Sequence, residues 1–279
     1  MSIVLLALLF TVVLLAQVRA KKKANQELAN KNQVIEKQKQ EVEEQRDLAH
    51  HQKQKITDSI NYAKRIQTAV LPPNNYVKSL LGEHFVLFRP RDIVSGDFYW
   101  MAQKEDHLII AAADCTGHGV PGAFMSMLGV AFLNEIVNKI AINRHIQTFQ
   151  ANEVLNQLRD QIIRSLHQDE DESALKDGMD IALCIIDLEN NTLQYAGAHN
   201  PLYIVRNGEL IHHKADKMPV SWHRNANVPF SNNHIKLNNS DCIYLFSDGF
   251  VDQLGGDKGM KFMSKAFKKI VTGNIPEAI

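Results

Sequence analysis

The chain has 279 residues, of which 45% are hydrophobic, and its 31 basic and 31 acidic side chains give a formal net charge of zero. This length suits one globular domain of about 200 residues with an extension. A balanced charge argues against a nucleic-acid-binding protein, which would show a basic surplus. The three cysteines form no CxxC pair, so we expect a reducing compartment and no zinc knuckle.

The amino terminus is almost wholly apolar over residues 3–18, and Arg19 and three lysines at 21–23 follow. The apolar run is slightly shorter than the roughly 20 residues of a membrane-spanning helix. A signal peptide, however, would place its basic residues before the run and a small-residue cleavage site after it. We therefore predict a single-pass membrane segment at residues 1–20, which could be the last span of a longer sensor protein. The positive-inside rule then places the rest of the chain in the cytoplasm.

Residues 21–71 are predicted to form a connecting helix, because they contain no glycine or proline. One heptad column of this stretch is apolar throughout. It consists of Leu28, Ile35, Val42, Ala49, Ile56, Ala63 and Val70. The companion column is mostly polar, so the pattern indicates a weak, adjustable coiled coil. Two alternatives stay open: a solvated single-helix spacer, or a parallel homodimer that carries a signal from the membrane to the globular part. Pro72 and Pro73 should end the helix.

The globular part opens with strands expected at residues 83–90 and 98–103. Between them lies the sequence VSGDFYW, in which Asp97 follows a glycine. Aspartate has a short side chain, so the backbone that carries it fixes the position of its carboxylate. For an isolated motif of this kind, a plain structural turn is the alternative.

The second acidic motif lies within LIIAAADCTGHGVPG at residues 108–122. Its apolar start predicts a buried strand that delivers Asp114 into a turn. Glycines on both sides of His118 hold that turn open and let backbone approach a ligand closely. Pro121 suits the first turn of a following helix. Cys115 adjoins the aspartate, and we interpret its thiol as a small buried side chain rather than a nucleophile.

The remaining elements follow from hydrophobic periodicity and turn residues. Helices are expected at 122–140 and 151–167, and residues 262–271 begin an amphipathic helix that reaches almost to the end of the chain. Strands are expected at 179–188, 192–198, 203–206, 210–214 and 242–246, with one or two edge strands at 228–237. Asp180, near the start of its strand, could reach the site from a flap, but a turn or surface role is the interpretation we favour. Hairpins with helices packed outside indicate an α+β sandwich.

A third acidic motif follows the last apolar strand, where Asp248 stands between Ser247 and Gly249. Three strand-like runs thus each place one aspartate beside a glycine. If Asp97, Asp114 and Asp248 converge, their oxygens would repel one another unless cations lie among them. Two metal ions at such a site could activate a water and bind a phosphoryl oxygen.

The motifs GDFYW, DCTGHGVPGAFMS and SDGFVDQ, in this order, resemble the SpoIIE/RsbU branch of the PPM (type 2C) metal-dependent protein serine/threonine phosphatases. Residues 59–73 resemble the lead-in to that domain, and residues 196–210 resemble its central hairpin, with AHNP in place of Gly-His-Asn-Pro. The resemblance covers residues 56–267. It implies a four-layer αββα sandwich at residues 72–279, with metal ions at one edge between the sheets.

The resemblance also implies the chemistry of the site. Two Mn²⁺ or Mg²⁺ ions would be held by Asp97, Asp114, Asp248 and the backbone carbonyl of Cys115, and a bridging water would attack phosphorus in line with the seryl oxygen. His118 is assigned either proton donation to the leaving group or a structural hydrogen bond. The implied substrate is a phosphorylated STAS-type regulatory protein, an anti-sigma-factor antagonist, in a signalling pathway at the inner membrane.

One feature departs from the family pattern. The family domain ends with a further strand bearing an Asp-Asp or Asp-Asn pair, which supplies a last metal ligand, and no such pair follows the helix expected at 262–271. We therefore expect either a truncated domain or impaired metal affinity. Two other functions stay open: a docking module that has lost catalysis, and a membrane-tethered coiled-coil scaffold whose globular end is incidental.

Overall fold

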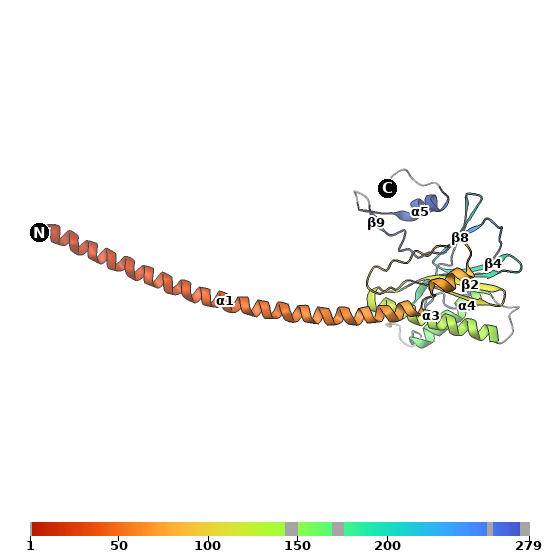
Figure 1. Ribbon diagram of the computed structural model, residues 1–279, viewed down its shortest axis with the longest axis horizontal. Coiled ribbons are helices and arrows are strands. Elements are labelled where there is room, and N and C mark those ends of the chain that lie inside the picture. The colour runs from red at the N-terminus through yellow and green to blue at the C-terminus, as the bar shows by residue number, and fades with distance from the viewer. Residues whose placement is uncertain (1, 143–149, 169–175, 256–258, 274–279) are drawn as a thin grey trace. The chain divides into compact units, whose positions relative to one another are not determined.

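The computed structural model describes residues 2–142, 150–168, 176–255 and 259–273. The chain divides into two compact units, residues 1–59 and 60–279. Helix α1 (Ser2–Val70) is a single helix of 69 residues (Figure 1). It ends immediately before the Leu71-Pro72-Pro73 sequence, so the predicted long helix and its end are confirmed.

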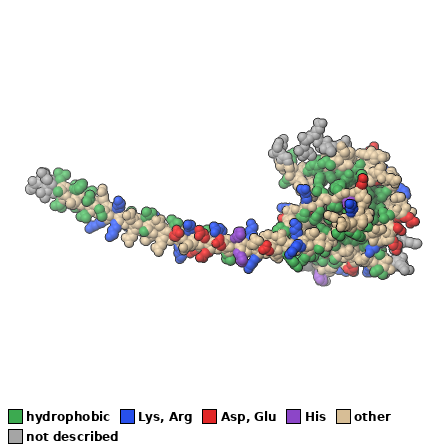
Figure 2. Space-filling model, in the orientation of Figure 1, with side chains coloured by type: hydrophobic (Ala, Val, Ile, Leu, Met, Phe, Trp, Pro, Cys, Tyr) green, Lys and Arg blue, Asp and Glu red, His purple; other side chains and the backbone are tan. Residues whose placement is uncertain are grey.

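The side chains of α1 change in character along the helix. Its large apolar residues from Leu5 to Val18 are exposed, and Figure 2 shows them gathered toward the amino-terminal end, with basic and acidic side chains interspersed farther along. The structure leaves the membrane segment at residues 1–20 and the pairing of α1 with a second helix as predictions.

Among the described residues, one helix is long and apolar enough to cross a membrane, and it is α3 (Gly119–Ile142). Half of its most apolar stretch is buried within the protein. The apolar composition of α3 is therefore that of a helix packed on the core.

The larger sheet has five antiparallel strands in the order β1-β2-β3-β4-β7. They are β1 (Phe98–Lys104), β2 (His107–Cys115), β3 (Met179–Asp187), β4 (Thr192–Ala198) and β7 (Asn233–Lys236). The small side chains Ala111 and Ala113 of β2 are buried, as the apolar run predicts. The β2–β3 register pairs Asp114 with Asp180 at the end of the ladder.

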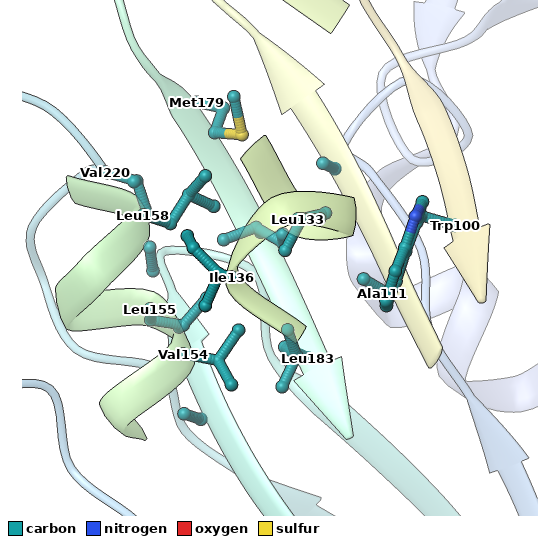
Figure 3. Packing of buried hydrophobic residues seen from close by; sticks show 14 of the residues in the cluster. Trp100, Ala111, Leu133, Ile136, Val154, Leu155, Leu158, Met179, Leu183 and Val220 are labelled. Carbon is teal, nitrogen blue, oxygen red and sulfur yellow. The ribbon is translucent and has the colours of Figure 1, made fainter. Parts of the chain in front are cut away.

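Helices α3 and α4 (Ala151–Ser165) pack on one face of this sheet. Figure 3 shows Leu133 and Ile136 of α3 meeting Leu155 of α4 and Leu183 of β3, all within one buried cluster. Burying each such side chain stabilises the fold by about 1.5–3 kcal/mol. At Gly129 an added Cβ would lie 2.8 Å from the terminal methyl of Met179, so the small residue allows α3 to approach the sheet closely.

A second sheet has three strands in the order β6-β5-β8. They are β5 (Leu202–Arg206), β6 (Glu209–His213) and β8 (Cys242–Tyr244). A second buried cluster joins the other face of the large sheet to this one, with Cys184 and Tyr195 facing Leu202 and Ile204. A third cluster joins Tyr203 of β5 to α5 (Met263–Val271) through Phe267.

Short elements complete the chain. They are α2 (Asn74–Leu80) and the two-stranded sheet of β9 (Leu254–Gly255) and β10 (Met260–Lys261). Most predicted elements agree with the structure to within three residues at each end, including β4, whose bounds are those predicted.

Three local predictions need correction. Residues 83–90 form no strand: Phe85 and Leu87, which a strand would place on one face, are 73% and 56% exposed, so no core holds them in register. Of residues 228–237, where one or two edge strands are predicted, only 233–236 form a strand, which is β7. Asp114 lies inside β2 rather than in the turn after it. Pro121 lies in the first turn of α3, as expected. The helix predicted to begin at 262–271 ends at Val271, and the part of that prediction beyond residue 273 lies outside the described residues.

Candidate active site

Asp97 immediately precedes β1 and follows the buried residues Ser95 and Gly96. A Cβ on Gly96 would lie 2.8 Å from the carbonyl oxygen of Gly117 and 3.2 Å from that of Cys115. Only glycine therefore fits between the loop that carries Asp97 and the turn that follows Asp114. This contact sets the separation of the two acidic segments.

The turn after β2 depends on glycine for a second reason. Gly117 and Gly119 have φ angles of +82° and +63°, in the left-handed region that other residues rarely adopt. Gly122, at the start of α3, has no room for a side chain because a Cβ there would be 2.6 Å from the Gly117 carbonyl oxygen. The turn between Asp114 and α3 is thus tightly folded.

The three predicted aspartates come together in the structure. The carboxyl group of Asp114 lies within hydrogen-bonding reach of both Asp97 and Asp248. Asp248 comes from the turn after β8, and the Ser247 hydroxyl donates a hydrogen bond of 2.8 Å to Asp97 Oδ2. Segments far apart in the sequence therefore bring three carboxyl groups to one place.

Their proximity changes the acidity of the central group. Burial, followed by the neighbouring Asp97 and Asp248, raises the pKa of Asp114 to about 8. Both the burial and the neighbouring carboxyl groups disfavour the charged form of Asp114. The charged form of this cluster requires positive charge beside it.

The donor chemistry fits a hard divalent cation, which prefers carboxylate and carbonyl oxygens. Within the described ranges, however, no group of three or more His, Cys, Asp or Glu side chains is arranged so that it could hold a metal ion. The predicted ligand set, Asp97, Asp114, Asp248 and the Cys115 carbonyl, stays a prediction.

The Cys115 side chain is 4% exposed and lies beneath this cluster. Burial, and then the charges of Asp114 and Asp97, raises the pKa of its thiol well above the ordinary value. A thiol that ionises so reluctantly is a poor nucleophile, in agreement with its interpretation as a buried filler.

His118 lies in the turn, and its Nδ1 is 2.9 Å from Asp92 Oδ2. The two side chains are 69% and 42% exposed. The bond joins the loop that precedes Asp97 to the turn that follows Asp114. This geometry suits the structural hydrogen bond that the sequence leaves open for His118.

Two further polar residues lie near the carboxyl cluster. Asp180 lies near the start of its strand, β3, as the sequence predicts, and the register places it directly opposite Asp114. Its Oδ1 is 2.8 Å from Nδ1 of His199. Burial raises the pKa of Asp180, and the bond from His199 opposes that rise. The sequence signal for Asp180 is its place at the start of a strand beside β2, but only the register shows what it faces.

The last turns of α1 reach the same region. Gln67, which is buried, donates to the carbonyl oxygen of Ser95 at 2.6 Å and to the Ser126 hydroxyl at 2.9 Å, and accepts from the Ser95 backbone N–H at 3.0 Å. Both backbone groups of Ser95 are therefore held by one side chain of the helix. Ser95 is separated from Asp97 by Gly96 alone.

Comparisons with known proteins agree with this architecture. The family model described as Stage II sporulation protein E (SpoIIE) matches residues 104–278. The solved SiaA-PP2C domain of Pseudomonas aeruginosa is 31% identical, with a TM-score of 0.69, and the match covers 81% of this chain and 85% of that domain. The comparison with curated proteins gives no match.

Two more distant structures show the same fold. One is the PP2C phosphatase domain, with a fragment of the regulatory domain, of the cell fate determinant SpoIIE from Bacillus subtilis, at 17% identity and TM-score 0.51, covering 64% of this chain and 48% of that one. The other contains the RsbU and RsbW domains of a Mycobacterium tuberculosis protein, at 17% identity and TM-score 0.50, covering 66% and 46%. At this identity the likeness concerns the fold alone.

Proposed function

The chain belongs to the SpoIIE family and has an α+β PP2C-like fold, and from this we propose that it hydrolyses phosphoserine or phosphothreonine on a regulatory partner protein. The observation that carries the proposal is the convergence of Asp97, Asp114 and Asp248 from three separate segments. A cluster of carboxyl groups that repel one another suits a pair of divalent ions, which prefer oxygen ligands.

We propose that Asp97, Asp114, Asp248 and the Cys115 carbonyl hold two Mn²⁺ or Mg²⁺ ions. When bound, such ions activate a water for attack on phosphorus and neutralise charge on the phosphoryl oxygens. The chain itself orients the ligands. The Ser247 hydroxyl fixes Asp97, and Gly96 and Gly117 keep the two acidic loops in contact.

The seryl leaving oxygen needs a proton as its bond to phosphorus breaks. Two histidines near the carboxyl cluster are held by aspartates and could supply it. They are His118, bonded to Asp92, and His199, bonded to Asp180. No phosphorylated enzyme intermediate is needed when water is the nucleophile.

For the substrate we propose a phosphorylated STAS-type regulatory protein, an anti-sigma-factor antagonist. The likeness to SpoIIE, described as a cell fate determinant, and to a protein with RsbU and RsbW domains supports a role in regulation. We further propose that residues 1–20 anchor the chain in the inner membrane, with the catalytic domain in the cytoplasm, and that α1 pairs with that of a second copy in a parallel dimer.

The domain organisation is proposed as residues 1–20, 21–71 and 72–279, with a four-layer αββα arrangement in the last. Three buried clusters support that arrangement, because they join α3 and α4 to the large sheet, the large sheet to the small one, and the small sheet to α5.

Hydrolysis of p-nitrophenyl phosphate and of a phosphoserine peptide, with and without Mn²⁺, tests the function. We expect a manganese-dependent rate that falls by about a hundredfold or more in Asp114→Asn, because that change removes a ligand charge. Asp160→Asn, an exposed carboxylate on α4, is the matched control and should keep the full rate.

A docking module without catalysis is the second candidate, and the lack of a preformed cation-binding group in the described residues favours it. It predicts that the chain binds its phosphorylated partner but shows no metal-dependent rate. That outcome would replace the phosphatase proposal.

A further inference from the structure

His199 is held in an unusual way at the end of β4. Its backbone has φ of +55°, a conformation that costs energy for a residue with a side chain. Its Nδ1 is 2.8 Å from Asp180 Oδ1, and the neighbouring Asn200 donates from Nδ2 to the Asp180 carbonyl oxygen at 3.1 Å. Asn200 is itself 7% exposed. The histidine is therefore fixed from both its ring and its backbone.

The pair lies beside the carboxyl cluster. Asp180 and Asp114 are direct partners in the antiparallel β2–β3 ladder, and such partners project to the same face of a sheet with their Cβ atoms about 4.5–5.5 Å apart. Asp180 is also close enough to Asp248 for the two charges to repel. The imidazole of His199 is thus bonded to a carboxyl group that adjoins Asp114 and Asp248.

The chemistry of the contact determines what the other ring nitrogen can do. An ionised carboxylate only accepts hydrogen bonds, so Nδ1 of His199 donates to Asp180. The bond to Asp180 occupies Nδ1, so Nε2 is the ring nitrogen that can act on a substrate. The His199 side chain is 41% exposed, so a substrate can reach it.

His118 is the alternative donor, but its setting differs. Its side chain is 69% exposed, and its partner Asp92 belongs to the loop before Asp97 rather than to a strand beside the cluster. The His118–Asp92 bond holds two loops together. The His199–Asp180 bond instead orients the His199 ring from a strand that carries a carboxylate opposite Asp114. A histidine oriented by a carboxylate in this way suits a proton donor.

We infer that His199, oriented by Asp180, is the general acid that protonates the leaving seryl or threonyl oxygen. Water bonds to phosphorus and releases one proton to solvent, the bond from phosphorus to the leaving oxygen breaks with its electron pair on that oxygen, and the Nε2 proton of His199 passes to it. His199 then regains a proton from solvent. Asp180 acts through the ring and is a positioning residue. The inference rests on the proposed phosphatase function.

The test compares two substrates that differ in their need for an acid. The leaving group of a phosphoserine peptide is the seryl oxygen, a basic alkoxide that needs a proton. The leaving group of p-nitrophenyl phosphate is p-nitrophenolate, which is stable without one. His199→Asn suits the left-handed backbone, which asparagine tolerates, and its side chain cannot act as an acid. We expect kcat with the peptide to fall about a hundredfold and kcat with p-nitrophenyl phosphate to fall less than about threefold, at saturating Mn²⁺.

Two variants and one further measurement complete the experiment. Asp180→Asn keeps an acceptor for Nδ1 but removes the charge, so it should show a smaller loss with the same substrate selectivity. His118→Asn should affect both substrates alike. Thermal unfolding of each variant shows whether the chain is folded. Two results would overturn this inference and leave the phosphatase proposal intact. One is an equal loss of kcat with both substrates in folded His199→Asn, and the other is a loss confined to the peptide in His118→Asn. A wild-type chain with no manganese-dependent rate would overturn the phosphatase proposal and this inference with it.

Discussion

Individual residues determine how the acidic segments meet. Gly96 leaves space for the Gly117 and Cys115 carbonyl oxygens, and Ser247 donates to Asp97. Burial, together with the neighbouring Asp97 and Asp248, raises the pKa of Asp114 to about 8. A divalent ion that binds there must displace the proton of that carboxyl group, so metal affinity should increase with pH.

The ion pair between Arg206 and Asp241 leads to a prediction about the free energy of unfolding. Arg206 Nε and one of its terminal nitrogens donate to the Asp241 carboxylate at 2.8 and 2.7 Å, and the Asp241 side chain is only 2% exposed. This contact holds the pKa of Asp241 below its ordinary value. We expect Asp241→Asn to lower the free energy of unfolding at pH 7 by about 1–3 kcal/mol.

The pH dependence follows from the direction of that shift. A carboxylate with a depressed pKa in the folded state stabilises fully above its unfolded pKa of about 4 and loses that effect as pH falls through the folded pKa. Urea titrations from pH 7 to pH 3 should therefore show the difference between wild type and Asp241→Asn shrinking with falling pH. Asp252→Asn, from the exposed pair with Lys261, is the control and should cost under about 1 kcal/mol. A difference that stays constant with pH would contradict the assignment.

The predictable and unpredictable parts of the site differ in physical origin. Asp97, Asp114 and Asp248 each follow or precede an apolar strand-like run and have a glycine within three residues, a local pattern that can be read from the chain. Asp180 depends on the β2–β3 register, and His199 depends on a left-handed backbone conformation that no glycine marks. Pairing register and such φ angles arise from tertiary structure, so local sequence does not reveal them.

At the scale of elements, the connection between α1 and the sheet is made by Gln67. Its amide satisfies both backbone groups of Ser95 and the Ser126 hydroxyl. Because Ser95 precedes Gly96 and Asp97, the end of the helix and the acidic loop form one hydrogen-bonded unit. The heptad pattern predicts the helix but gives no indication of this polar contact.

Gln67→Leu keeps the approximate size of the side chain and removes these bonds. We expect the free energy of unfolding to fall by about 1–3 kcal/mol, since buried backbone groups lose their partners, and the Mn²⁺ concentration for half-maximal activity to rise. Chemical denaturation and metal titration measure the two effects. Gln54→Leu on the same helix, whose side chain bonds exposed Asp58, should change stability by less than about 0.5 kcal/mol. Equal effects of the two variants would show that Gln67 has no special role.

The elements themselves were predictable to different degrees. Strongly periodic or small-residue stretches, such as those of β2, β4 and α4, form where the pattern places them. The strand predicted at 83–90 does not form, because an apolar stretch becomes a strand only when a partner pairs with it, and Phe85 and Leu87 lie exposed. Pairing is a property of the fold and is not contained in one segment.

At the scale of the whole molecule, two units of different character share one chain. Residues 1–59 belong to a continuous helix with exposed apolar side chains at its start, while the second unit contains the buried clusters and the acidic site. Such a division suits a protein that receives a signal in one part and acts in another. A weakly paired α1 would let a small input change the state of the second unit.

The central claim is that the gathered carboxylates bind divalent ions, and calorimetric titration of Mn²⁺ into the whole chain tests it directly. We predict two ions bound per chain at pH 8, with weaker binding at pH 6 and with binding lost or reduced to one ion in Asp114→Asn. Wild-type protein that binds no Mn²⁺ at either pH, or that binds it equally well after Asp114→Asn, would contradict the claim.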